Sequence, residues 1–154
     1  MKDQSSIVLR RAGAADVEPF FEIRTSVAEN HMSREELAAV GVTVETLSAL
    51  LQSEQVAGFV VTRGGRALGF SMARADLGDV FALFVRPDAQ GAGLGSRLLS
   101  EAERWLKTKN VRSVWLLTGD KSKAVRFYEK RGWRRDGSQA DGQIRFVKRF
   151  GDAE

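Results

Sequence analysis

The sequence lacks cysteine and contains one histidine among its 154 residues. Without cysteine there is no disulfide, no thiolate metal ligand and no cysteine nucleophile. A single histidine also excludes a histidine-rich metal centre, so we expect no metal site. Tyrosine is equally scarce: the one tyrosine is Tyr128, and any chemistry that needs a phenol must use it.

Long apolar runs are missing as well. No stretch approaches the ~18 consecutive apolar residues of a membrane-spanning helix, and the N-terminal residues 1–6 do not have the pattern of a signal peptide. We therefore expect a cytoplasmic protein with no membrane partner. The length fits one ordinary domain over residues 1–154, and 43% apolar residues suffice for a core.

Positive charge is concentrated in the second half of the chain. The net charge is +4, but residues 1–77 hold 8 Lys and Arg against 10 Asp and Glu, whereas residues 78–154 hold 16 against 10. A basic half suits a polyanionic small ligand and equally suits nucleic acid. The charge alone does not decide between these two partners.

The stretch 79–109 combines an apolar run, a glycine-rich loop and an amphipathic run. Val80 to Val85 is continuously apolar, which is typical of a strand buried on both faces. Pro87 ends it, and glycines follow at positions 91, 93 and 95. Apolar residues then recur at helical spacing. Backbone N–H groups of such a loop, together with the positive end of the helix dipole, form a site for an anion such as a pyrophosphate.

Two common phosphate-binding motifs do not fit this loop. A dinucleotide fingerprint needs a third glycine where Ser96 or Leu98 stands, and a P-loop needs a lysine that is absent here. The observed pattern is Gln90-x-x-Gly93-x-Gly95 after Arg86-Pro87. It resembles motif A of the GNAT superfamily of N-acetyltransferases, which binds the pyrophosphate of acetyl-coenzyme A. A glycine-rich turn into a core helix is the structural alternative.

A second segment strengthens this resemblance. Residues 127–133, Phe-Tyr-Glu-Lys-Arg-Gly-Trp, are similar to the Phe-Tyr-Glu-Lys-x-Gly-Phe segment of the GNAT superfamily, with Trp133 in place of phenylalanine. Lys121 is a larger departure, because family members commonly carry there an asparagine that binds the pantetheine arm; Ser122 is a candidate substitute. The resemblance covers about residues 7–150.

The hydrophobic periodicity predicts the order β-α-α-β-β-β-α-β-α-β-β. This order matches the α/β GNAT fold, an α+β sandwich whose mixed, mostly antiparallel sheet is flanked by helices. We expect residues 79–118 to form a right-handed parallel crossover. The helices are expected over 16–30, from Ser33 to Leu51 with an interruption at Gly41, over 94–109 and over 121–131. The strands are expected over 7–12, 56–62, 67–74, 80–85, 111–118, 133–136 and 144–150, with a turn at Asp136-Gly137 between the last two.

The resemblance implies acetyl-CoA as cosubstrate and a set of residues that bind it. The backbone of the central strand is expected to bind the pantetheine, and the glycine loop the pyrophosphate. The residues expected to bind the cosubstrate are Leu83, Phe84, Val85, Gln90, Gly91, Ala92, Gly93, Leu94, Gly95, Ser96, Arg97, Ser122 and Phe127. One or two cations of the basic run 121–135 are further candidates for the ribose phosphate.

Two residues are candidates for the proton transfers. Tyr128 is the candidate general acid, because its reference pKa of ~10 lies above the ~8.5 of a simple thiol and leaves it a proton to give. A core tyrosine is the alternative reading. Asp79 is the candidate general base, at the position where many GNAT members carry glutamate. A turn aspartate after Gly78 is the alternative reading there.

The end of the first helix and the loop after it border the acceptor site in the GNAT fold. The candidate substrate-binding residues are Glu22, Arg24, Glu29, His31 and Phe81. Because the first half is acidic, we expect a cationic amine acceptor. His31 also fits a surface or capping role, and Phe81 also fits core packing.

We therefore expect an N-acetyltransferase that moves an acetyl group from acetyl-CoA to a primary amine by direct attack. A small molecule, a peptide N-terminus and a protein lysine remain open as acceptors, and the resemblance allows a homodimer. One alternative is a GNAT-like module that binds acyl-CoA without turnover. Another is a nucleic-acid binder, which no interleaved aromatic motif supports.

Overall fold

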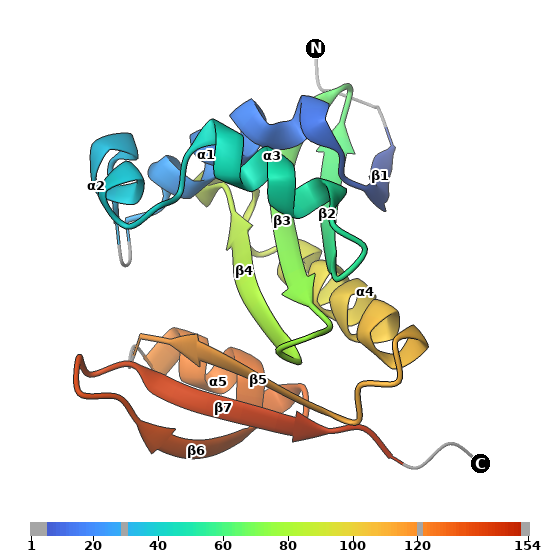
Figure 1. The fold of residues 1–154 in the computed structure, drawn as a ribbon, viewed down its shortest axis with the longest axis vertical. Coiled ribbons are helices and arrows are strands. Elements are labelled where there is room, and N and C mark those ends of the chain that lie inside the picture. The colour runs from blue at the N-terminus through green and yellow to red at the C-terminus, as the bar shows by residue number, and fades with distance from the viewer. Residues whose placement is uncertain (1–5, 29–30, 120–121, 152–154) are drawn as a thin grey trace.

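The computed structural model describes residues 6–28, 31–119 and 122–151. Its described residues form a seven-stranded sheet in the order β1-β2-β3-β4-β5-β7-β6 (Figure 1). Only β4 and β5 pair in parallel; the other neighbours are antiparallel. The expected mixed, mostly antiparallel sheet is confirmed. The strands are β1 (Ile7–Arg11), β2 (Val56–Arg63), β3 (Arg66–Arg74), β4 (Asp79–Val85), β5 (Ser113–Thr118), β6 (Arg134–Ser138) and β7 (Ile144–Arg149).

Helices cover both faces of this sheet. On one face, α1 and α3 pack against β2, β3 and β4, and on the other face α4 packs against the same strands. The helix α5 joins a cluster with α4, β5 and β7 (Figure 1). The helices are α1 (Val17–Ser26), α2 (Arg34–Ala39), α3 (Val44–Gln52), α4 (Leu94–Thr108) and α5 (Ser122–Lys130), with short 3₁₀ segments η1 (Ala14–Asp16) and η2 (Pro87–Ala89).

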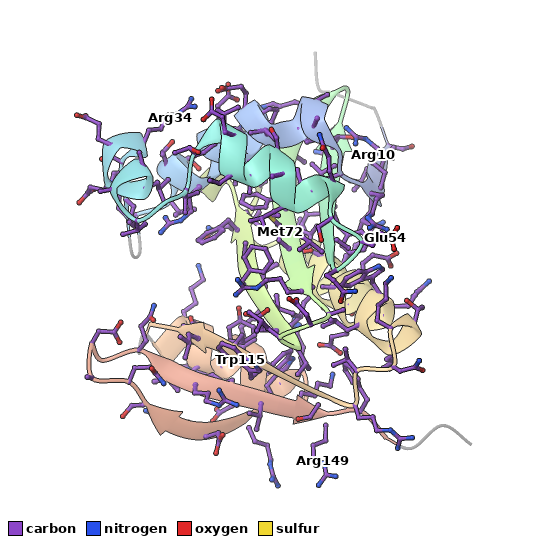
Figure 2. All side chains as sticks on the ribbon, viewed as in Figure 1. Arg10, Arg34, Glu54, Met72, Trp115 and Arg149 are labelled. Carbon is purple, nitrogen blue, oxygen red and sulfur yellow. The ribbon has the colours of Figure 1, made fainter. Side chains whose placement is uncertain are left out.

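The side chains are buried or exposed as this layering requires. Figure 2 shows Met72 in the interior, whereas Arg10, Arg34 and Arg149 lie at the periphery. Met72 is 1% exposed on the face of β3 that α1 and α3 cover. Across the described residues, no helix has both the length and the apolar character that crossing a bilayer requires.

The first half confirms the predicted elements, with bounds that differ by up to a few residues. The helix α1 ends at Ser26 rather than near residue 30. Ser33 caps α2 as expected: its hydroxyl accepts from the Glu36 N–H at 3.1 Å, and the Glu36 carboxylate accepts from the Ser33 N–H at 2.9 Å. Asp16 stands at the N-cap of α1 but its side chain does not cap that helix. Its carboxylate accepts instead from the Gly13 N–H at 2.8 Å.

The predicted turn at Asp136-Gly137 is wrong. β6 continues through both residues, with a register shift between Arg135 and Ser138 and a φ of +91° at Gly137. The turn lies at residues 139–142, where the Gln139 N–H donates to the Gln143 carbonyl at 2.7 Å. An Asp-Gly pair supplies the positive φ that a hairpin turn needs, but an irregular strand pair uses the same conformation.

A glycine on β3 lets α4 lie close to the sheet. A Cβ atom at Gly69 would lie 2.9 Å from the Phe84 carbonyl oxygen and 3.2 Å from Leu98 Cδ1. Next to it, the Ser71 hydroxyl donates to the Leu98 carbonyl at 3.1 Å. The helix that follows the glycine loop is therefore fixed directly against β3 and β4.

The strands β4 and β5 form a fork. They pair at a single position, Asp79 opposite Trp115, and then diverge toward their C-terminal ends (Figure 1). A β-bulge lies just beyond the pairing point, because Met72 faces Ala82 and Ala73 faces Val80, which leaves Phe81 without a partner on β3. Bulges re-aim side chains and are frequent beside functional sites. The fork leaves the β5-facing edge of β4 free to bind another molecule.

Candidate active site

Two pockets open into the fork. The first, called the loop pocket, has a volume of about 650 Å³ and lies between the end of β4, the glycine loop and α5. The second, called the inner pocket, has a volume of about 380 Å³ and lies between β4, β5 and the helices α1 and α3. Both volumes are in the ~300–1,000 Å³ range of small-molecule sites.

The glycine loop and the start of α4 place residues with unpaired helix-terminal N–H groups in the lining of the loop pocket. Gly91 and Gly93 have φ values of +87° and +81°, a region in which a Cβ atom is strained. Gly93 is the N-cap of α4, and the first bond within the helix runs from the Arg97 N–H to the Gly93 carbonyl at 3.2 Å. The N–H groups of residues 94–96 therefore precede the helical ladder. Together with the helix dipole they form an anion site.

Two cations of α5 and the turn after it face the same pocket. The Lys123 ammonium donates to Gln90 Oε1 at 3.2 Å, and Gln90 Nε2 donates to the Val85 carbonyl at 3.1 Å. Arg131 Nε donates to the Ser96 hydroxyl at 3.0 Å. Both cations line the loop pocket, so a polyphosphate there would meet two positive charges.

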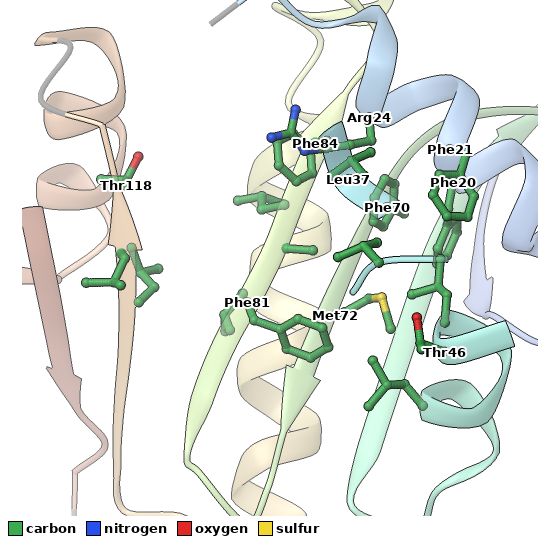
Figure 3. Close-up of a pocket in the computed structure, with 18 of the residues that line it drawn as sticks. Phe20, Phe21, Arg24, Leu37, Thr46, Phe70, Met72, Phe81, Phe84 and Thr118 are labelled. Carbon is green, nitrogen blue, oxygen red and sulfur yellow. The ribbon is translucent and has the colours of Figure 1, made fainter. Parts of the chain in front are cut away.

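The inner pocket is mainly apolar. Phe81, on the bulge of β4, and Met72 point into it, and Thr118 faces it from β5 across the fork (Figure 3). Among the described lining residues, Arg24 is the only charged side chain. Its guanidinium lies 4.6 Å from the centre of the Phe84 ring. The other polar side chains of the lining are those of Thr46, Thr118, Tyr128 and Gln143.

The two pockets meet at four residues that line both: Leu83, Phe84, Thr118 and Tyr128. Tyr128 is 8% exposed and packs its ring edge-on against Phe127, with ring centres 5.1 Å apart. Burial raises the pKa of Tyr128 above its ordinary value. Its hydroxyl is therefore a proton donor at every pH near neutrality.

Most residues predicted to bind the cosubstrate gather at the loop pocket. Ala92 and Arg97 are exposed and do not line it. Ser122 begins α5, but its side chain is outside the described ones, as is Lys121. The predicted residues that do line it are Leu83, Phe84, Val85, Gln90, Gly91, Gly93, Leu94, Gly95, Ser96 and Phe127.

Asp79 is not brought to either pocket. Its side chain is 2% exposed, and its two carboxylate oxygens accept from Arg74 Nε at 3.0 Å and Nη2 at 2.6 Å. The Arg74 guanidinium in turn lies 4.2 Å from the centre of the Phe81 ring. In this arrangement Asp79 fixes the base of the fork, and only Phe81 reaches the inner pocket.

Of the predicted acceptor residues that the structure describes, two line the inner pocket and two do not. Arg24 and Phe81 line the inner pocket. Glu22 does not, and its carboxylate pairs with Arg86 at 3.3 Å. His31 is exposed, with a ring nitrogen 3.1 Å from the Thr25 carbonyl oxygen, and lines neither pocket. Glu29 is outside the described residues.

Some lining residues escaped the sequence prediction. Lys123 and Arg131 were present only as members of the basic run 121–135, where nothing singled them out. Thr118, at the end of β5, and Gln143, in the turn before β7, carried no sequence signal, because both reach the inner pocket only through tertiary folding. Arg131 lies within the 127–133 segment, and its place there is the sequence signal that points to it.

Comparison with known proteins decides the family. The acetyltransferase (GNAT) family matches residues 20–133, which include β4, the glycine loop and α5. The chain belongs to the acetyltransferase (GNAT) family. No cluster of three or more potential metal ligands occurs among the side chains that the structure describes.

Curated relatives match this GNAT chain over part of their length. An uncharacterised N-acetyltransferase of Methanocaldococcus jannaschii is 27% identical over 111 residues, which are 66% of this chain and 49% of the relative. A mycothiol acetyltransferase of Actinosynnema mirum is 38% identical over 84 residues, which are 51% of this chain and 28% of the relative. The chain thus spans half or less of these relatives.

Solved structures reproduce the GNAT fold over nearly the whole chain. The PaiA N-acetyltransferase from Thermoplasma acidophilum, crystallised in complex with coenzyme A, has a TM-score of 0.81 at 19% identity. The match covers 94% of this chain and 99% of that protein. At this identity the comparison confirms the predicted fold.

Proposed function

We propose that this GNAT chain transfers an acetyl group from acetyl-CoA to a primary amine by direct attack. The observation that carries the proposal is the junction of the two pockets at Leu83, Phe84, Thr118 and Tyr128. A thioester that enters through the loop pocket and an amine held in the inner pocket would meet there. Proximity of this kind replaces a bimolecular encounter by an oriented one.

The loop pocket has the donors that a coenzyme A molecule requires. Backbone N–H groups of residues 94–96, at the start of α4, suit the pyrophosphate. Lys123 and Arg131 supply charge that suits further phosphate oxygens. The free edge of β4 at residues 83–85 offers backbone donors and acceptors to the amides of the pantetheine arm.

Acetyl-CoA, when bound, supplies a thioester carbon that is open to attack and a thiolate that leaves. Tyr128 lines both pockets at their junction and keeps its proton because burial raises its pKa. Its hydroxyl stabilises the developing thiolate by hydrogen bonding and protonates it as it departs. The attacking nitrogen gives up one proton to water, the sulfur gains one from Tyr128, and solvent then returns a proton to the Tyr128 phenolate.

The inner pocket favours a neutral amine without a dedicated carboxylate base. No aspartate or glutamate is among its described lining residues, and Asp79 is engaged by Arg74. Apolar surroundings and the positive charge of Arg24 both disfavour an ammonium ion, so they lower the pKa of a bound amine. Water at the mouth of the pocket can then accept the proton.

Acetyl-CoA-dependent thiol release, measured over a panel of primary amines, tests this function. We expect thiol release to require both the protein and an amine, and the product to be the N-acetylated amine. Tight binding of coenzyme A with no release across the panel would instead identify a binding module without turnover. A calorimetric titration on the same sample separates these two results from a failure to bind coenzyme A.

A further inference from the structure

The inner pocket also carries information about the acceptor. We infer that the acceptor is a small α-amino acid with an apolar side chain, whose carboxylate faces Arg24 and whose amine lies at the junction of the two pockets. This inference rests on the proposed function, because it names the substrate class of the same site.

The first argument is the chemistry of the pocket walls. One wall is built from β4 side chains such as Phe81 and Phe84, and another from Val42, just before α3, and Leu50, within α3. Burying an apolar side chain against such walls contributes roughly 25 cal/mol for each Å² removed from water. A hydrophilic or multiply charged body would be desolvated there without partners.

The second argument is charge. Arg24 is half-buried and is the only charged side chain among the described lining residues. A polyamine would bring further positive charges beside that guanidinium, and like charges at close range are unfavourable. Glu22, which the sequence offered as a partner for a cationic acceptor, points to Arg86 instead. The described walls therefore favour an anionic group over a second cation.

The third argument is position. Phe84 lines both pockets, and the Arg24 guanidinium lies 4.6 Å from the centre of its ring. An amine at the junction therefore has this cation beside it, while Phe81 and Met72 line the inner pocket away from Arg24 (Figure 3). A carboxylate on the carbon next to the amine can reach the guanidinium while the side chain points inward.

The fourth argument is size. A volume of about 380 Å³ is at the lower end of small-molecule sites. It suits a free amino acid with a side chain such as that of leucine or phenylalanine.

The test compares matched acceptors with the wild-type protein. L-leucine and L-phenylalanine are set against the same molecules without the carboxylate, isoamylamine and phenethylamine, and against spermidine. We expect kcat/KM for the amino acids to exceed that for the carboxylate-free amines and for spermidine by at least tenfold. Equal or better use of the carboxylate-free amines, or a preference for spermidine, would overturn the inference but leave the acetyltransferase function in place.

Arg24→Gln then assigns the effect to the guanidinium. We expect KM for the amino acids to rise at least tenfold and by a larger factor than KM for phenethylamine, which has no carboxylate, while the affinity for coenzyme A stays within threefold of wild type. Arg24→Lys keeps the charge but loses the planar guanidinium. We expect its KM for the amino acids to lie between those of wild type and Arg24→Gln. An unchanged KM for the amino acids in Arg24→Gln would contradict the inference.

Arg34→Gln is the matched control. Arg34 also places a guanidinium over an aromatic ring, 4.4 Å from the centre of Phe21, but it is exposed and lines neither pocket. We expect its KM values to match wild type. A rise equal to that of Arg24→Gln would show that loss of any stacked arginine in this region disturbs binding, and would overturn the assignment. No turnover of any amine, with coenzyme A still bound, would overturn both the inference and the proposed function.

Discussion

At the scale of single residues, the site centres on Tyr128, which lines both pockets and is largely buried. Replacement by phenylalanine removes one oxygen and keeps the ring packing against Phe127 and Trp133. We expect kcat to fall roughly tenfold to a thousandfold, within the lower part of the range for general acid catalysis. Coenzyme A affinity and the melting temperature should change little. A lower melting temperature with turnover intact would assign the tyrosine to structure alone.

The raised pKa of Tyr128 also predicts how the stability of the protein changes at alkaline pH. Burial raises the pKa of Tyr128 in the folded state, so above the unfolded value of ~10 the folded protein holds a proton that the unfolded chain loses. This contribution to stability is fully present below pH ~10 and is lost as the pH rises above it. Since Tyr128 is the one tyrosine, tyrosinate absorbance reports it alone. We expect the band to appear only with unfolding, and ionisation near pH 10 in the folded protein would refute this.

At the scale of elements, we propose that the glycine loop and α4 bind the coenzyme A pyrophosphate together. Gly93→Asp places a side chain at a φ of +81° and a negative charge beside the N-terminus of the helix. We expect the affinity for coenzyme A, measured by calorimetry, to fall at least tenfold, which is about 1.4 kcal/mol. Gly65→Asp is the control, because Gly65 has the same φ of +81° and equally open space but lies in the β2–β3 turn. Equal losses in both variants would mean that strain, and not the loop, sets the affinity.

A buried polar network connects α4 to the C-terminal strands. Glu103 accepts from the Trp133 indole N–H at 3.0 Å and from the Lys148 ammonium at 2.8 Å. Glu103→Ala leaves both donors short of a partner, so we expect the free energy of unfolding to fall by about 2–3 kcal/mol. Glu101→Ala should cost less than about 1 kcal/mol, because Glu101 forms only a 3.8 Å pair with the exposed Arg104. Denaturant unfolding of both variants measures the difference, and similar losses would argue against the network.

At the scale of the whole molecule, the sequence predicted the order of elements and the position of the loop pocket. Both rest on local signals: apolar periodicity, caps such as Ser33, and glycines such as Gly93, whose conformation is decided within a few residues. The turn at Asp136-Gly137 was misplaced because a local signal there fits two backbone geometries. The inner pocket depends on tertiary folding, which brings Gln143 and Arg24 to the lining of one pocket and pairs Asp79 with Arg74, and no local pattern encodes this arrangement.

Two pockets that meet at Tyr128 predict that both substrates are bound together before the acetyl group moves. Initial rates of thiol release, measured over a grid of acetyl-CoA and acceptor concentrations, test this claim most directly. The structure predicts intersecting double-reciprocal lines and no thiol release without an amine. Parallel lines, or a burst of thiol equal to the protein concentration before an amine is added, would indicate a covalent acetyl-enzyme and would contradict direct attack.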